Sequence, residues 1–432
     1  MIDRISSLPH SIILHILSLL PTAEVIRTSL ISKRWRHLWE SVPALEFCDV
    51  GVEEQELYNF LNKFLEHRMI GKRRLNDLGI NRFKLEMQSY GGSSSVHVDR
   101  CLSFAVQQHL EELDLHIQPK KIGSVSFFYR IPSFYYCIPS LTVLKLSRFR
   151  LDDEVFHNLI TGCPSLEKLF LRNCLGLRHL KVSSSNLKSF ELISVDRVNS
   201  CLVEAVNLQS LVFNLCGSDS QLDLVSCKSV RNLKLNYAHP SHIPSLEVVI
   251  SELRILESLT LVDFDIDIIQ NQYLKVLVLK RTTIEDDDED EWDDKMEITV
   301  NTPSLVSFHY EDVNFTCKVL LNSPNLEEAN IKLDYNGVRK KIDMNWYVDM
   351  IDFLSYFDCS KVVNLYVYSE ENLMFPEKLR KFCRSPLPNV KHLKVETRCE
   401  LKSESLLRDA LLWLSPHTQT LSIRSEENKA QS

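Results

Sequence analysis

Leucine and other apolar residues recur along most of the chain in the unit apolar-x-x-apolar-x-apolar. Thirteen such units, the last three degenerate, follow at intervals of roughly 18 to 36 residues and begin at Leu110, Leu141, Leu166, Leu187, Leu208, Val230, Leu256, Leu274, Leu305, Leu326, Val362, Val390 and Thr418. The last two apolar positions of a unit flank a single residue, which is typical of a strand with one buried face. A repeat of this length predicts a solenoid, because each unit buries its apolar face only by stacking against the next unit.

The period and the leucine content of these units are typical of leucine-rich repeats. We therefore predict an α/β fold in which residues 110–424 form a leucine-rich-repeat solenoid, with parallel strands on its concave face and helices and irregular returns outside. Apolar residues at helical spacing predict outer helices over residues 152–160, 346–357 and 406–414. The other returns are too short for a full helix, and we expect them to be irregular.

Residues 50–109 link the repeats to a block at the N-terminus. Apolar residues at helical spacing predict helices over residues 53–69 and 96–109. Between them, Phe83, Leu85 and Met87 alternate with polar residues, as in a half-buried strand. This region therefore predicts linking helices and a first strand.

Residues 8–39 show a different pattern, with apolar residues at helical intervals in three short segments. Pro21 ends the first segment, Thr22 is a candidate N-cap for the second, and residues 32–39 form the third. Three helices in so short a block cannot bury all of their apolar residues among themselves. The excess predicts a partner protein, with a protective cap on the solenoid as the alternative.

Four motifs in this block occur in order: Asp3–Pro9 (DRISSLP), His15–Ser18 (HILS), Leu20–Thr22 (LPT) and Ser32–Trp39 (SKRWRHLW). Together they resemble the F-box of the large plant family that joins an F-box to leucine-rich repeats. The resemblance implies that residues 1–49 dock onto a Skp-type adaptor and through it onto a cullin ubiquitin ligase. The adaptor-binding residues it implies are Leu8, Pro9, Ile12, Ile16, Leu17, Leu20, Pro21, Val25, Ile26 and Trp35. His10 departs from the family, which usually has an acidic residue there, but the apolar contacts are unchanged.

The C-terminal part of the chain carries a second resemblance to the same plant family. It rests on Ser385–Lys394 (SPLPNVKHLK) and Leu411–His417 (LLWLSPH). In the family this region often leads into a module called FBD. We therefore expect residues 355–424 to be a degenerate, FBD-like end of the solenoid, followed by a polar tail over residues 425–432.

Charge and cysteine usage narrow the range of partners. The net charge is −8, and nine of the ten residues from Glu285 to Asp294 are acidic, so this run accounts for the whole negative excess. We interpret it as a solvated insertion, with a contact for a basic partner as the alternative. The sequence has no basic stripe for nucleic acid, no apolar run long enough for a membrane span, and twelve cysteines without a Cys-x-x-Cys pair. We expect an intracellular protein of the nucleus, the cytoplasm or both, without nucleic-acid or membrane partners.

The motifs of nucleotide and hydrolytic chemistry are missing from the sequence. The chain has ten glycines but no Gly-x-Gly-x-x-Gly, Gly-Lys-Ser/Thr, Gly-x-Ser-x-Gly or His-Glu-x-x-His motif. We therefore predict no enzyme activity, no cofactor, and no catalytic or metal site. The aromatic cluster Phe127, Phe128, Tyr129, Phe134, Tyr135 and Tyr136 is interpreted as a buried insertion, with a recognition loop as the alternative.

These patterns together favour the substrate-recognition subunit of a ubiquitin ligase, in which the F-box binds the adaptor and the strand surface binds a target protein. Target contacts are expected at outward-facing strand positions such as Glu112, Asp114, Lys145, Arg172 and Lys234. The alternative is a leucine-rich-repeat scaffold of the same architecture outside any ligase. An enzyme with a hidden active site is the third hypothesis.

Overall fold

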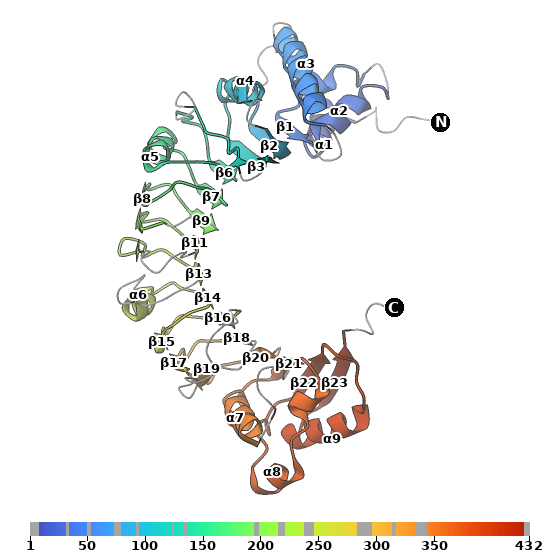
Figure 1. The fold of residues 1–432 in the computed structure, drawn as a ribbon, viewed down its shortest axis with the longest axis vertical. Coiled ribbons are helices and arrows are strands. Elements are labelled where there is room, and N and C mark those ends of the chain that lie inside the picture. Colours follow the sequence, from blue (N-terminus) through green and yellow to red (C-terminus); the bar gives the residue numbers. More distant parts are fainter. Residues whose placement is uncertain are drawn as a thin grey trace. The chain divides into compact units, whose positions relative to one another are not determined.

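The computed structural model describes most of the chain, in two compact units. The described residues are 8–31, 34–49, 53–72, 79–91, 95–122, 125–132, 137–193, 198–214, 221–236, 246–282, 296–312, 317–333, 342 and 344–426. The first unit comprises Met1–Leu208 and Cys216–Cys227, and the second comprises Gln209–Leu215 and Lys228–Ser432. Within them, N-terminal helices are followed by a series of parallel strands, which confirms the predicted α/β fold (Figure 1).

The first unit is built on a ladder of parallel strands. These are β1 (Ala44–Cys48), β2 (Arg82–Tyr90), β3 (Glu112–Pro119), β6 (Val143–Ser147), β7 (Lys168–Arg172) and β9 (Ser189–Ile193). Their register aligns Leu113 with Leu144, Leu144 with Leu169, and Leu169 with Phe190, and all four side chains are buried. The ladder already begins at β1, ahead of the repeats seen in the sequence, because Leu45 and Phe47 continue the same alternation.

The second unit continues this pattern with its own ladder. Its strands are β11 (Ser210–Asn214), β13 (Asn232–Asn236), β14 (Ser258–Val262), β16 (Val276–Arg281), β18 (Ser307–Asp312), β20 (Glu328–Leu333), β21 (Val362–Val367), β22 (His392–Thr397) and β23 (Thr420–Ser425). The predicted position of the repeat unit starting at Val362 was wrong by two residues. In the structure Val363, and not Leu365, aligns with Leu393. A slip of two residues keeps the same face buried, and Val367 is buried as well, so the alternation alone could not fix the register.

Several returns that we expected to be irregular contain strands of their own. In the first unit, β8 (His179–Ser183), β10 (Ser200–Glu204) and β12 (Gln221–Asp223) form a parallel sheet. In the second unit, β15 (Ile268–Gln270), β17 (Met296–Asn301) and β19 (Cys317–Asn322) form another. A short antiparallel pair, β4 (Lys121–Ile122) with β5 (Val125–Ser126), completes the strands that the structure describes. Returns too short for a helix therefore still bury alternate side chains, such as Leu180 and Val182, by pairing with one another.

Helices occupy the longer returns. They are α3 (Glu54–Lys72), α4 (Ser95–Val106), α5 (Asp153–Gly162), α6 (Leu246–Glu252), α7 (Met344–Ser355), α8 (Glu377–Phe382) and α9 (Glu404–Leu414). This confirms the helices expected near residues 53–69, 96–109, 152–160, 346–357 and 406–414, whereas α6 and α8 were not predicted. Asp152 caps α5 by accepting a hydrogen bond from the Val155 amide at 2.8 Å. In Figure 1, α5 lies beside β8, on the side of β6 and β7 where the returns run.

The N-terminal block contains two α-helices and a 3₁₀ helix among its described residues. These are α1 (His10–Leu17), α2 (Thr22–Thr28) and η1 (Leu38–Ser41). The predicted third helix is present only in part, since residues 34–37 form turns and the 3₁₀ helix η1 follows them. The predicted N-cap was also wrong, because Pro21 occupies that position and the Thr22 hydroxyl instead accepts a hydrogen bond from the Glu46 amide at 2.8 Å. Thr22 thus ties α2 to β1.

Arg68 of α3 joins the N-terminal block to the repeats. Its side chain is buried, and its guanidinium donates to the Trp39 carbonyl at 3.0 Å and to the Val42 carbonyl at 2.7 Å. Burial lowers the pKa of Arg68 to about 10, so the group stays charged at neutral pH. The rings of Trp39 and Phe64 pack beside this anchor with centroids 5.4 Å apart.

Replacing Arg68 with methionine should loosen the N-terminal block from α3, because two carbonyls lose charged donors. We expect a destabilisation of about 2–4 kcal/mol in the first unit. Hydrogen exchange should show faster exchange of the amides of η1 and β1, with β18–β22 unchanged. The control is Lys63→Met on the exposed side of α3; if both variants exchange like the wild type, Arg68 is not an anchor.

Asn271 is a buried polar residue whose hydrogen bonds are all made within the second unit. Its Nδ2 donates to the carbonyls of Ile250 and Leu253 at 2.7 and 3.0 Å, and its Oδ1 accepts from the amides of Tyr273 and Leu274 at 2.8 and 3.0 Å. The side chain thus joins the end of α6 to the turn that enters β16.

Asn271→Leu should destabilise the second unit by about 2–4 kcal/mol, because the substitution leaves buried backbone groups without partners. The matched control is Asn325→Leu, since Asn325 is exposed and makes a single side-chain bond, to the Pro303 carbonyl at 2.8 Å. Urea unfolding should separate the two variants. Equal midpoints would contradict the role given to Asn271.

Candidate functional site

The two faces of α1 differ sharply in exposure. Ile13 and Leu17 are fully buried, whereas Ile12 is 46% exposed and Ile16 is 38% exposed. Leu19, just past the helix, is 66% exposed. Together with the exposed Pro9, these three residues recur at helical spacing on the outer side, and we call Pro9, Ile12, Ile16 and Leu19 the α1 stripe.

The inner side of the block forms a small core of its own. Its buried members are Ile13, Leu17, Val25, Trp35, Leu38 and Val42, with Leu8, Leu14, Leu20 and Trp39 packed against it. Three of the residues predicted to bind the adaptor, Leu17, Val25 and Trp35, therefore lie in this core and present no surface to a partner. Their role is to hold α1 and α2 in place.

The other predicted adaptor residues reach the surface to different degrees. Pro9, Ile12, Ile16 and Pro21 are exposed, and Leu8, Leu20 and Ile26 are partly buried. Three further apolar residues of the block are exposed but were not singled out from the sequence: Leu19, and the pair Leu30 and Ile31 after α2, which are 86% and 60% exposed. The available signal was their position just beyond a helix end, where an apolar side chain has no helical neighbour to cover it.

The strand surface of the first unit carries ion pairs between neighbouring strands. Lys145 lies 2.7 Å from Glu112 and 3.6 Å from Asp114, and Arg172 lies 2.5 Å from Glu191. These residues include predicted target contacts, and each is already paired within the chain. Exposed pairs of this kind are weak and can exchange partners.

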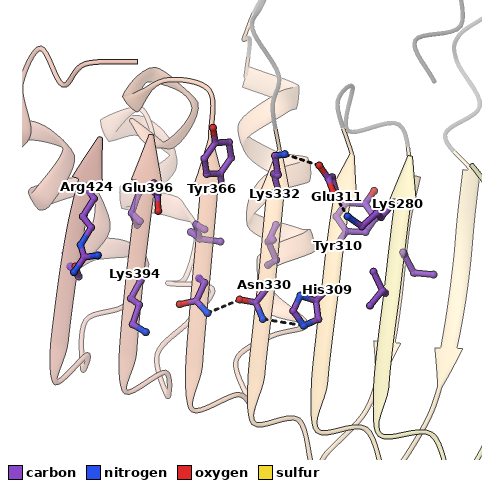
Figure 2. A pocket seen from close by; sticks show the side chains of 17 residues that line it. Lys280, His309, Tyr310, Glu311, Asn330, Lys332, Tyr366, Lys394, Glu396 and Arg424 are labelled. Atoms are coloured by element: carbon purple, nitrogen blue, oxygen red, sulfur yellow. Dashed lines mark hydrogen bonds and ion pairs between the residues drawn. The ribbon is translucent and has the colours of Figure 1, made fainter. Parts of the chain in front are cut away.

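The strand surface of the second unit contains a groove of about 570 Å³ across β16, β18, β20, β21, β22 and β23 (Figure 2). Four cationic side chains and two carboxylates line it: Lys280, Lys332, Lys394 and Arg424 with Glu311 and Glu396. They occupy positions that alternate with buried residues, so they face away from the core. None of these six residues is among the target contacts named from the sequence. The signal was there, in the repeated lysine at the residue after the second buried position of β16 and β20.

At one end of the groove the charges are paired. Glu311 lies between Lys280 and Lys332, 2.7 Å from each ammonium, as Figure 2 shows. Burial of Glu311 opposes its negative charge, but the two lysine hydrogen bonds outweigh this and lower the pKa of its carboxyl group. The Lys332 ammonium also lies 5.4 Å from the centre of the Tyr366 ring.

The floor of the groove is a chain of polar side chains. Asn364 donates to the Asn330 Oδ1 at 2.7 Å, and the Asn330 amide lies 3.5 Å from the His309 Nε2. Burial lowers the pKa of His309, so its ring is neutral at pH 7 and can accept this bond. The floor is thus a fixed hydrogen-bonding surface.

At the other end of the groove, two cations have no partner among the residues that the structure describes. Lys394 on β22 and Arg424 on β23 are exposed and make no hydrogen bond or ion pair with any residue that the structure describes. Glu396 and Arg424 are paired in register across the two strands, yet no ion pair joins them. With two cations and the single carboxylate of Glu396, this end carries a net positive charge.

The aromatic cluster predicted between the first two repeats has one buried and one exposed member among the described residues. Tyr129 is buried and its hydroxyl donates to the Asp99 carboxylate, which agrees with the buried interpretation of the aromatic cluster, while Phe127 is 39% exposed. Phe134, Tyr135, Tyr136 and the acidic run Glu285–Asp294 lie outside the described residues.

The described residues show neither a metal-binding cluster nor a membrane-spanning helix. In those parts of the chain, no cluster of three or more histidine, cysteine, aspartate or glutamate side chains could hold a metal ion. Among the described helices, none has the length and hydropathy to cross a membrane.

Comparison with known proteins identifies the two regions separately. Residues 5–46 match the F-box domain family, and residues 118–235 match the family described as "FBD-associated F-box protein At5g56370, LRR repeats". F-box domains generally bind Skp-type adaptors.

Similar proteins in Arabidopsis thaliana cover larger parts of the chain. F-box/LRR-repeat protein At3g58900 is 34% identical over 49% of this chain and 70% of its own length, and F-box/LRR-repeat protein 25 is 34% identical over 42% and 72%. F-box/LRR-repeat protein At3g18150 is 30% identical over 60% of this chain. The chain spans 57% of the length of that relative and 53% of the length of F-box/LRR-repeat protein At5g02930. On its helical block, its strand ladder and these similarities, the chain belongs to the F-box/LRR-repeat family.

Proposed function

We propose that this chain is the substrate-recognition subunit of a Skp–cullin–F-box ubiquitin ligase. The observation that carries the proposal is the α1 stripe, an exposed apolar surface on a block whose own core is already filled. Isolated exposed apolar residues are ordinary, but a row of them on one helix is typical of an interface. The stripe would receive a Skp-type adaptor, with a cullin bound through it.

The second half of the proposal assigns the strand surfaces to a target protein. Repeat surfaces suit this task because their outward positions vary without changing the fold. The chain itself would perform no chemistry and would need no cofactor, since its contribution is to raise the effective concentration of target lysines near the ligase. It would act in the nucleus, the cytoplasm or both, without contact to nucleic acid or membrane.

Several hydrogen bonds fix the N-terminal block rigidly to the first strands of this chain. Arg34 donates to the Leu8 carbonyl at 2.7 Å, and Arg82 of β2 donates to the Ser18 carbonyl at the end of α1. With Thr22 and Arg68, these contacts hold the helices that carry the α1 stripe against the first strands. An adaptor bound to the stripe would therefore be held in a fixed orientation to the first unit.

Ile12→Ser with Leu19→Ser should weaken binding of a purified Skp-type adaptor by about tenfold or more, because each loses an interface anchor worth about 1–2 kcal/mol. Calorimetry with the full chain measures this. The control is Val206→Ser with Val225→Ser, since these apolar residues of the first unit are 56% and 66% exposed. The control should bind like the wild type.

Leu17→Ala distinguishes the core from the contact surface. This change should cost about 2–5 kcal/mol of stability, because it opens a cavity in the core of the N-terminal block. Adaptor binding at low temperature should fall much less than with the Ile12/Leu19 variant. If the wild-type chain binds no adaptor at all, the scaffold hypothesis replaces the ligase.

A further inference from the structure

The groove of the second unit divides into a paired end and an unpaired end. Lys280 and Lys332 share Glu311 at the end on β16–β20, whereas Lys394 and Arg424 on β22 and β23 have no partner among the described residues. We propose that this groove binds a short acidic segment of a partner protein, whose carboxylates pair with Lys394 and Arg424. The inference rests on the proposed function, because it names the kind of target that the strand surface would receive.

The charge of the groove favours an anionic occupant. Four cations and two carboxylates line it, and one carboxylate, Glu311, is already shared by two lysines. An incoming carboxylate would form charge-assisted hydrogen bonds with Arg424 and Lys394 without breaking an existing pair. In Figure 2 these two side chains lie on adjacent strands, on the far side of Tyr366 from Glu311.

The dimensions of the groove favour an extended peptide. Strands in a sheet are about 4.8 Å apart, so the path from β20 across β21 and β22 to β23 measures about 14 Å. An extended chain rises about 3.3 Å per residue, so four or five residues cover this path. Along it, the Asn330 and Asn364 side chains and the Ser422 hydroxyl line the groove. These groups can bond to peptide amides and carbonyls.

Two observations argue against a nucleic-acid strand in the groove. Glu311 and Glu396 line it between the cations, so a continuous row of phosphates would meet like charge. The net charge of the whole chain is −8, which adds long-range repulsion. A short acidic segment avoids the first problem, because its carboxylates can be spaced to meet Lys394 and Arg424, and it reduces the second because it carries fewer charges than a nucleic-acid strand.

The test uses the full-length chain and a fluorescein-labelled peptide of five alternating aspartate and glutamate residues, with an asparagine–glutamine peptide for comparison. Fluorescence anisotropy should show binding of the acidic peptide that weakens from 50 to 300 mM NaCl, because salt screens exposed charges. Lys394→Gln with Arg424→Gln should reduce the affinity by about tenfold or more.

The matched control is Lys378→Gln with Arg384→Gln. These two residues are also exposed cations of the second unit without a partner among the described residues, and they lie in and just after α8, outside the groove. This control removes the same charge and should bind the acidic peptide within about twofold of the wild type. The reversed variant Lys394→Glu with Arg424→Glu should lose the acidic peptide and bind a lysine–arginine peptide instead.

The proposal is overturned if the acidic peptide fails to bind, if both double variants weaken it equally, or if the asparagine–glutamine peptide binds as well. Tighter binding of a single-stranded RNA of eight nucleotides, lost in the Lys394/Arg424 variant, would overturn it in favour of nucleic acid. Adaptor binding is measured in parallel and should be unchanged in every groove variant. A failure of the groove is thus distinguishable from a failure of the ligase proposal.

Discussion

Everything in this molecule depends on one constraint: a strand buries its inward side chains only between two neighbouring strands. Leu277, Phe308 and Ala329 illustrate this, since each lies in register with the next and all three are buried. No repeat has a core of its own, so the stability of each strand depends on the strands on either side of it. The ends of a ladder then need a cover. At β1 this cover is supplied by α2 and α3, whereas at β23 Leu421 and Ile423 remain only partly buried.

The constraint also explains how much of the fold could be predicted from the sequence. Buried positions repeat along each strand, so most strands and the longer helices were evident from the apolar pattern. The register of β21 was not, because Val363, Leu365 and Val367 are all buried and satisfy two alignments. Among the outer strands, β12 and β15 have only three residues and one buried position each, which is too few to reveal a period. Three helices were predicted in the block at residues 8–39, but residues 34–37 form turns, and the buried Trp35 lies in these turns and not in a helix.

The candidate sites were harder to predict than the fold, for a physical reason. On α1, core and surface residues have the same composition, and only the structure separates Ile13 from Ile12. On the strands, a charged residue looks alike in the sequence whether it is paired or not. Lys145 and Lys394 occupy equivalent faces, yet among the described residues only Lys145 forms ion pairs with carboxylates. Whether a charged residue is paired depends on neighbours that are distant in the sequence, and the amino-acid composition does not identify these neighbours.

The bond between the Glu46 amide and the Thr22 hydroxyl has a consequence for how such proteins can be recombined. β1 belongs to the helical block through this bond and to the repeats through its pairing with β2. A crossover placed just after residue 49 would join β1 to the repeats of another protein and so separate β1 from its own partner strand, β2. Exchanges that keep α1 through β2 together, including α3 with Arg68, preserve both sets of contacts. Shuffling between members of this family, in a genome or at the bench, is therefore expected to succeed at the loops between later repeats and to fail at the motif boundary that the sequence makes most visible.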